Sequence, residues 1–297
     1  LRDAGGPLEW QPLIRMHRGE EGAPLFLLPG AGGNIIYLYG LARRLGQHRL
    51  VFGLQSLGLD GLTKQLPSIQ EIARFNIEKI FEGGFAGPYV LAGHSFGAKV
   101  AFEMSQQLLH SSTEVALVII FDTPAPVFEP VVDRQDWNDA QWLFQMTREI
   151  EEYLGVDLEI TCSQLSSLSP EDQLDLVAAA LQRTGWWAEG WDRSQLQAYL
   201  RVFRTNVQID SRFRVDPGRD LLPVRLVLFK AREGHHAPDN PELAALFKQE
   251  TWGWDRLSPY PVQVFEVPGD HLTMMSDHNV ETLAEEVRAC LTAVQTS

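Results

Sequence analysis

The segment Gly93-His94-Ser95-Phe96-Gly97 has the G-x-S-x-G pattern of a serine that acts as a nucleophile. It follows an apolar run at residues 89–92 and precedes an amphipathic stretch, which is the strand–turn–helix context that this pattern requires. A sharp turn strains the backbone at Ser95 and exposes its Oγ, and the flanking glycines lack the Cβ atoms that would collide there. The alternative is a serine in an ordinary glycine-rich turn. The context favours nucleophilic acyl transfer at Ser95.

A serine hydroxyl is a poor nucleophile at neutral pH and needs a general base. Among eight histidines, His271 follows an apolar run at 262–267 and the turn Pro268-Gly269-Asp270, just before the last helical pattern. In the chain order serine, acid, histidine, the base belongs in such a late loop. His94 lies inside the turn and cannot easily face its neighbour's Oγ. The pair His235-His236 has no third ligand at metal-binding spacing, so His271 is the predicted base.

The acid that orients the base can be chosen from three residues. Asp122 ends the apolar run 115–121, whereas Glu233 and Asp239 follow the next run, at 224–229. A carboxylate at the end of an apolar strand is fixed and partly desolvated, which suits it to orienting an imidazole. Glu233 and Asp239 lie in a loop rich in glycine, histidine and proline. Asp122 is therefore favoured, and the other two stay open as alternatives.

Acyl transfer also needs backbone N–H groups that stabilise a tetrahedral oxyanion. The amide of Phe96, directly after the serine, is one predicted donor. The second should come from the loop after an earlier strand, and the run 25–28 leads into Pro29-Gly30-Ala31-Gly32-Gly33, with Ala31 as the candidate. This loop fails as a dinucleotide-binding fingerprint because position 35 is isoleucine, and as a P-loop because it lacks the Gly-Lys-Ser/Thr end. The oxyanion role is favoured.

The scaffold around these groups alternates short apolar runs with helical patterns, which predicts an α/β fold: a mostly parallel sheet with helices on both faces. Little polar alternation occurs in the runs, as expected for strands covered on both faces. Strands are expected at 25–28, 50–54, 89–92, 115–121, 224–229 and 262–267. Apolar stripes predict helices over 69–80, 98–109 and 280–294, the first with a capping box formed by Ser68 and Glu71.

The stretch 126–217 breaks this alternation and predicts three consecutive helices. They are expected at 137–153, 170–183 and 193–208, the second with Ser169 as N-cap and Pro170 in its first turn. A helical insertion in an α/β sheet commonly covers the strand ends where ligands bind. The alternative is an elaboration with a purely structural role.

Composition narrows the classes of partner. The chain has 297 residues and a formal net charge of −14, which argues against a nucleic-acid surface because phosphate binding needs a basic face. No apolar run approaches the roughly 20 residues of a membrane span. Cys162 and Cys290 are far apart in the sequence, so we do not expect a disulfide framework. The scarcity of cysteines favours a cytoplasmic location. The opening Leu1-Arg2-Asp3 favours a segment of a longer polypeptide or a trimmed chain.

With these residues in place, the chain resembles the type I thioesterase domains that end nonribosomal peptide and polyketide synthases, and the thioesterase of animal fatty acid synthase. The resemblance covers nearly the whole length. It rests on Pro-Gly-Ala-Gly-Gly (29–33), Gly-Pro-Tyr-Val-Leu-Ala-Gly-His-Ser-Phe-Gly (87–97), Val-Ala-Phe-Glu-Met (100–104), Phe-Asp-Thr (121–123) and Gly-Asp-His (269–271). It implies an α/β-hydrolase fold, one domain over 1–297 with a helical lid at 126–217, and an acid at Asp122.

The resemblance also implies a reaction. An upstream acyl or peptidyl carrier domain presents the chain as a 4'-phosphopantetheine thioester, Ser95 takes it as an oxyester, and His271 passes the proton to the leaving thiol. Water then gives a free acid, or a hydroxyl or amine of the chain closes a macrocycle, and no metal or bound cofactor is needed. Residue 94 is histidine, where tryptophan or tyrosine is frequent in synthase-terminal members and histidine occurs in stand-alone editing thioesterases.

Other functions stay open beside this one. A carboxylesterase or lipase on diffusible esters would share the triad without a carrier, while the intact Ser95, Asp122 and His271 speak against an inactive binding module. The mode of release is a separate question. Three tryptophans, at 186, 187 and 191, favour an apolar, dry chamber. Exclusion of water would slow hydrolysis relative to an internal nucleophile.

Overall fold

The computed structural model describes residues 10–19, 22–45, 49–127, 134, 136–185, 193–234 and 240–295. Within them, seven strands form one sheet in the order β1-β3-β2-β4-β5-β6-β7. The strands are β1 (Leu13–Arg18), β2 (Leu25–Leu28), β3 (Leu50–Leu54), β4 (Tyr89–His94), β5 (Val115–Phe121), β6 (Leu226–Ala231) and β7 (Gln263–Val267). Only β1 runs antiparallel to its neighbour among these, so the prediction of a mostly parallel sheet is confirmed.

Three predicted strands need correction at their boundaries, and for the one expected at 262–267 the change is a single residue, because β7 begins at Gln263. The strand predicted at 224–229 lies at Leu226–Ala231, and the one predicted at 89–92 continues to His94, so the first two residues of the serine motif belong to the sheet. The strand β1 was not predicted. It is an edge strand whose Arg15, His17 and Arg18 interrupt the apolar pattern.

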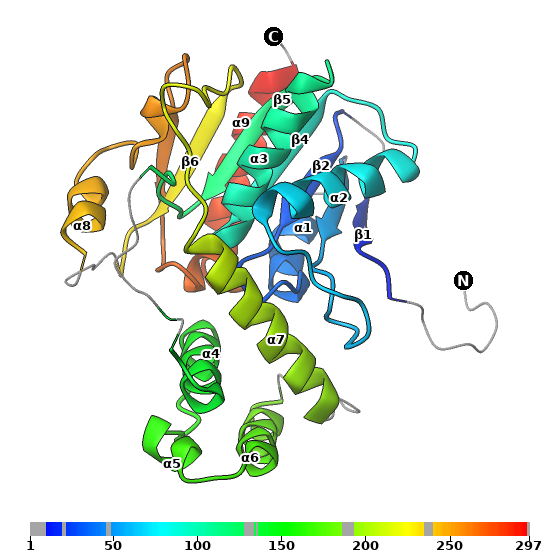
Figure 1. Cartoon of the computed structure of the whole chain (residues 1–297). Coiled ribbons are helices and arrows are strands. Elements are labelled where there is room, and N and C mark those ends of the chain that lie inside the picture. The colour runs from blue at the N-terminus through cyan, green and yellow to red at the C-terminus, as the bar shows by residue number, and fades with distance from the viewer. Residues whose placement is uncertain are drawn as a thin grey trace.

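Helices cover both faces of the sheet (Figure 1). One face packs against α2 (Ile69–Glu82) and α3 (Phe96–His110), and the other against α1 (Tyr39–Leu45) and α9 (Val280–Gln295). Alternate residues of each buried strand therefore enter different cores: in β5, Val118 and Ile120 pack toward α3, and Ile119 packs toward α9. This two-sided burial explains the continuous apolar runs in the sequence.

In its described residues, the chain between β5 and β6 forms four helices with an apolar core of their own. They are α4 (Asp139–Leu154), α5 (Cys162–Ser166), α6 (Pro170–Arg183) and α7 (Arg193–Asp210). In Figure 1 they lie below the sheet, and α7 extends from this group toward α3. The three predicted helices are confirmed with small shifts at their ends, and Ser169 caps α6 by accepting a hydrogen bond from the Asp172 amide. The short helix α5 was not predicted.

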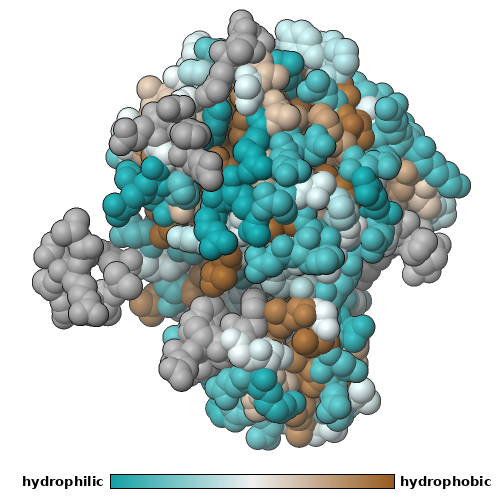
Figure 2. All heavy atoms as spheres, turned by 180° about the vertical axis from the view of Figure 1, so that it is seen from behind, coloured by the Kyte–Doolittle hydropathy of each residue, from teal (hydrophilic) through white to brown (hydrophobic). Residues whose placement is uncertain are grey.

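The helix α2 begins at the expected cap, because Ser68 Oγ accepts a hydrogen bond from the Glu71 amide at 3.2 Å. The short helices α1 and α8 (Pro241–Phe247) were not predicted. None of the helices in the described part of the chain combines the length and apolarity needed to cross a membrane. Seen from behind, the surface is mostly hydrophilic, and hydrophobic side chains gather on the lower part, over the α4–α7 group (Figure 2).

Parallel register brings the functional segments together. In the sheet, His94 at the end of β4 pairs with Phe121 at the end of β5, and Phe121 pairs with Phe229 in β6. The next residues, Ser95 and Asp122, therefore leave the same edge of the sheet on neighbouring strands. The loop after β7 reaches this edge as well, because β7 pairs in parallel with β6.

Candidate active site

Ser95 lies in a sharp turn between β4 and α3. Its φ of 54° and ψ of −122° are an unusual backbone conformation for a residue with a side chain, held by the elements on either side. A Cβ on Gly93 would lie 2.1 Å from the Gly97 carbonyl oxygen, and a Cβ on Gly97 would lie 2.3 Å from the Leu28 carbonyl oxygen. The predicted steric role of both glycines is confirmed, and the turn has the geometry of a nucleophile elbow.

Asp122, which is buried, and His271, which is partly exposed, form a hydrogen-bonded pair. The Nδ1 atom of His271 lies 2.9 Å from Oδ2 of Asp122, whose other oxygen accepts a hydrogen bond from the Ala231 amide at 2.6 Å. An ionised carboxylate can only accept, so Nδ1 carries the proton and Nε2 keeps its lone pair. Burial lowers the pKa of His271, but the hydrogen bond and charge of Asp122 outweigh it and raise this pKa above its ordinary value.

Glu233 does not share this position. Glu233 is exposed to solvent, and its amide bonds to the Gly269 carbonyl. Asp239 and the pair His235-His236 lie outside the described residues. Within the described part of the chain, no three His, Cys, Asp or Glu side chains are grouped to hold a metal ion. Of the two alternatives that the structure describes, Asp122 is the one that lies against His271.

Ser95 and His271 line one cavity of about 380 Å³, which we call the main cavity. Between the described residues there is no hydrogen bond from Ser95 to the His271 ring. Catalytic hydrogen bonds are often long in a free enzyme and tighten when substrate binds, so this geometry is compatible with a nucleophile–base pair. Gly30, Ala31, Phe96 and residues of α4 and α7 complete the walls of the cavity.

The loop that carries Ala31 is fixed at three consecutive peptide groups. The Gly30 amide donates to Tyr37 Oη at 2.8 Å, and the Gly33 amide donates to the Gly30 carbonyl at 2.9 Å. Asn206 of α7 donates to the Ala31 carbonyl at 2.8 Å. The peptide group that contains the Ala31 N–H is thus held on both sides, which is the rigidity that an oxyanion donor needs.

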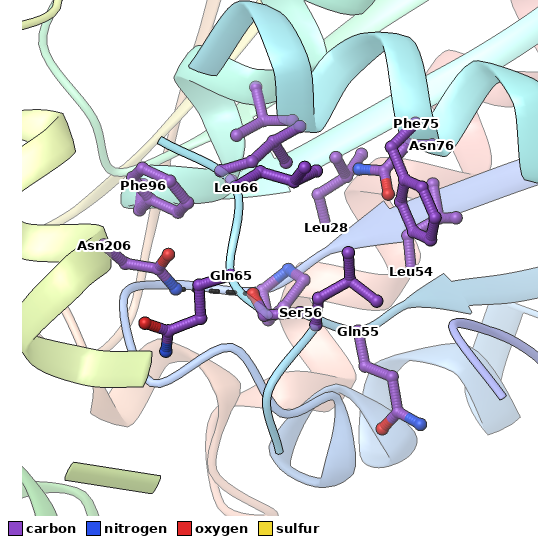
Figure 3. A pocket seen from close by; sticks show the side chains of 15 residues that line it. Leu28, Leu54, Gln55, Ser56, Gln65, Leu66, Phe75, Asn76, Phe96 and Asn206 are labelled. Carbon is purple, nitrogen blue, oxygen red and sulfur yellow. Dashed lines mark hydrogen bonds between the residues drawn. The ribbon is translucent and has the colours of Figure 1, made fainter. Parts of the chain in front are cut away.

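Asn206 makes a second contact, to Ser56 Oγ at 3.3 Å, across a small pocket beside Phe96 (Figure 3). This pocket measures about 30 Å³, enough for about one or two water molecules and too small for an acyl chain. The main cavity is therefore the candidate substrate site.

A directed chain of hydrogen bonds links the glycine loop to the base. The His271 carbonyl can only accept, so His94 Nε2, at 2.7 Å, must carry a proton. His94 Nδ1 then accepts from the Tyr37 hydroxyl at 2.9 Å, and Tyr37 accepts from Gly30. Burial, with the adjacent His271 second, lowers the pKa of His94 to about 3, which keeps its ring neutral.

Sequence reasoning missed three members of this arrangement: Tyr37, Asn206 and Ala231. Tyr37 lies in the short 3-10 turn Ile36–Leu38 and Asn206 lies within a long helix, and neither position carries a local pattern that indicates its partner. His94 did carry a signal, since a histidine stands at the end of an otherwise apolar strand.

The elbow, the acid after β5 and the histidine after β7 on a mostly parallel sheet define an α/β-hydrolase fold. A sequence model of the family described as "Thioesterase domain" matches residues 23–291. The chain belongs to this family, and its relatives are thioesterase domains associated with nonribosomal peptide synthetases.

Three comparisons illustrate the relationship. Chondramide synthase cmdD of Chondromyces crocatus is 30% identical over 269 residues, which cover 89% of this chain and 6% of that protein. The structure of holo-AB3403, a four-domain nonribosomal peptide synthetase, aligns with a TM-score of 0.81 at 26% identity over 94% of this chain and 20% of that one. The type II thioesterase YbtT shares the fold, with a TM-score of 0.67 at 18% identity over 96% and 99% of the chains. The chain thus spans a small part of the synthases that it matches.

Proposed function

We propose that this chain is a chain-releasing thioesterase that takes an acyl or peptidyl chain from a phosphopantetheine thioester onto Ser95. The observation that carries the proposal is the 2.9 Å pair of Asp122 and His271, which opens on the same cavity as the strained Ser95. The base, the acid that orients it and the nucleophile are the three groups that serine acyl transfer requires.

In the first half of the reaction, His271 Nε2 takes the proton from Ser95 as its Oγ attacks the thioester carbonyl. The amides of Ala31 and Phe96 stabilise the resulting oxyanion, and the charge of Asp122 stabilises the imidazolium. When the intermediate collapses, the carbon–sulfur bond breaks and the proton passes from His271 to the leaving thiol. The product is an acyl-Ser95 ester and a free phosphopantetheine thiol.

In the second half, a nucleophile releases the chain from Ser95, and we favour water over a group of the chain itself. The apolar, dry chamber expected from Trp186, Trp187 and Trp191 stays a prediction. In the described lining of the main cavity, Glu149, Tyr153 and Tyr199 contribute polar groups. The three tryptophans lie outside the described residues. A polar lining can hydrate the ester, which supports hydrolysis.

We further propose that residues 126–217 act as a lid within one catalytic domain. The lid helices supply walls of the main cavity, with Glu149 from α4 and Tyr199 from α7. The synthase relatives support a carrier domain as partner, with the acyl chain delivered on its 4'-phosphopantetheine. The cytoplasmic location expected from the cysteines stays a prediction.

The purified chain can be tested with an acyl-phosphopantetheine thioester and with a simple alkyl ester of the same acyl group. We expect a preference for the thioester, loss of turnover in Ser95→Ala, and labelling of Ser95 by a serine-reactive phosphonate. A preference for the simple ester would identify a carboxylesterase instead, and failure of labelling would identify a binding module. A substrate with an internal hydroxyl tests release, since a cyclic product would contradict hydrolysis.

A further inference from the structure

Glu149 places a partly buried carboxylate in the main cavity. It lies on α4, and its side chain lines the same space as Ser95 and His271. Burial raises the pKa of Glu149 above its ordinary value, because the charged form loses hydration there.

The carboxylate has little compensation from the protein. Among the described residues its hydrogen-bond partner is Gln145, whose Nε2 lies 3.3 Å from one oxygen, near the limit for such a bond. His271 and Arg134 line the same cavity, and the charge of His271, followed by that of Arg134, favours the ionised form of Glu149. No ion pair within 4 Å joins Glu149 to a cation of the described part of the chain.

The neighbouring Tyr199 does not supply a hydrogen bond to the Glu149 carboxylate. The Tyr199 ring lies against the glycine loop, where a Cβ on Gly32 would lie 2.2 Å from its hydroxyl, and that hydroxyl interacts with Asn34. Burial and then the charge of Glu149 raise the pKa of Tyr199, so the carboxylate acts on this ring without a hydrogen bond from it.

Partial loss of hydration is unfavourable for a weakly partnered carboxylate, and a ligand cation would offset that free energy. The ligand of this cavity is the acyl chain held by Ser95. A protonated amine matches the site because it supplies both a positive charge and N–H donors to the open carboxylate oxygen.

We propose that Glu149 forms a subsite for a protonated amine on the acyl chain, so that the substrates are amino-acyl or peptidyl chains with a free amino group. This inference rests on the proposed thioesterase function. The Glu149 subsite would distinguish such chains from plain fatty acyl chains of equal length, because a fatty acyl chain leaves the carboxylate without a cationic partner.

The test uses thioesters of N-acetylcysteamine in three matched series, with an amine, a methyl group or a carboxylate at the end of acyl chains of four to eight carbons. The readout is the ratio of kcat/KM for amine-ended to methyl-ended substrates at each length. We expect a ratio of about 10 or more at one or more lengths for the natural chain, and a still lower value for carboxylate-ended substrates. The mass of the product separates acid from lactam.

Three variants locate the effect. Glu149→Gln should bring the ratio close to 1. Glu171→Gln, which changes an exposed carboxylate on α6 outside the lining of the main cavity, should keep the ratio of the natural chain. Glu149→Lys should reverse the order and favour the carboxylate-ended series. Thermal melting and phosphonate labelling of Ser95 establish that each variant is folded with a reactive serine.

The outcomes separate the two proposals. A ratio near 1 in the natural chain at every length, or an unchanged ratio in Glu149→Gln, would overturn the amine subsite. Hydrolysis of the methyl-ended thioesters in the same experiment would still support the thioesterase function. No Ser95-dependent hydrolysis of any of the three series would overturn the thioesterase function itself.

Discussion

The Nε2–H of His94 donates a hydrogen bond of 2.7 Å to the main-chain carbonyl of His271, so the residue before the proposed nucleophile holds the backbone of the proposed base. The two rings also lie close together, with their centroids 4.7 Å apart. Through Tyr37 the same imidazole reaches the Gly30 amide in the proposed oxyanion loop. His94 therefore ties together the three segments that must keep their relative positions during acyl transfer.

Replacing His94 tests this positioning role. His94→Leu removes both hydrogen bonds and should lower kcat by about 10- to 100-fold with a small change in KM, because the base loop loses its anchor. His94→Gln should recover part of the loss, since its amide can still donate to the His271 carbonyl. Steady-state kinetics on a thioester measure both values. His110→Gln, an exposed histidine at the end of α3, is the matched control, and equal effects of Leu and Gln at position 94 would contradict the model of a donated bond.

Removing the charge of the acid should abolish most turnover. Asp122→Asn keeps the size of the side chain but no longer stabilises the imidazolium, and can leave the proton on the wrong nitrogen of His271. We expect a fall in kcat of up to about 10⁴-fold. Glu233→Gln changes an exposed carboxylate and should keep nearly full activity, as should Asp239→Asn. A large loss in either of these, with activity retained in Asp122→Asn, would move the acid to the loop after β6.

The pH dependence should reveal one ionisation on the acid side. His271 must be neutral to accept the serine proton, and its pKa is raised, so kcat/KM should rise with pH to a midpoint above the ordinary imidazole value of about 6.5. His94, with its pKa lowered to about 3, stays neutral over this range and adds no second step. A plot of log kcat/KM against pH should therefore have a slope of 1. A slope of 2 would mean that both rings titrate together.

The same plot should shift in a variant of the acid. Asp122 is the partner that raises the pKa of His271, so Asp122→Asn should move the midpoint of its residual activity to lower pH. Glu233→Gln should leave the midpoint in place, and an unmoved midpoint in Asp122→Asn would mean that another group sets the pKa of the base.

The sequence predicts the residues that local pattern and parallel topology determine. The five-residue motif predicts Ser95, and the positions after apolar runs predict Asp122 and His271, because parallel strands end at one edge of the sheet. Contacts between distant segments have no such signal: Tyr37 meets His94 across 57 positions of the chain, and Asn206 meets Ala31 across 175. Such partners are set by how α7 and the turn at 36–38 pack, which no local pattern describes.

The misses in the fold have a similar physical cause. The strand β1 is an edge strand with charged residues, and α1, α5 and α8 have seven residues or fewer, too short for a helical period to be recognised. The polar lining of the main cavity was also missed. Glu149 lies in an amphipathic helix whose pattern does not show that one of its carboxylates faces a cavity rather than water.

Asn206 couples the α4–α7 group to the proposed oxyanion loop, and its removal should affect both stability and rate. Asn206→Ala leaves the Ala31 carbonyl without its donor in a site where Asn206 is 4% exposed, which should cost about 1–3 kcal/mol of unfolding free energy. The freed loop holds the Ala31 N–H less accurately in position, so kcat should fall by about tenfold. This fall is smaller than the one caused by complete removal of an oxyanion-hole donor.

A comparison of two substitutions separates these effects. Asn206→Asp has nearly the same shape but turns a donor into an acceptor that faces the Ala31 carbonyl, so it should lower kcat at least as much as Asn206→Ala. Arg201→Ala, at an exposed position of the same helix, is the control and should leave thermal stability and kcat close to those of the natural chain. If Asn206→Ala lost stability but kept full kcat at a temperature where it stays folded, the contact would support the fold alone, and the Ala31 amide would be positioned sufficiently by Gly33 and Tyr37.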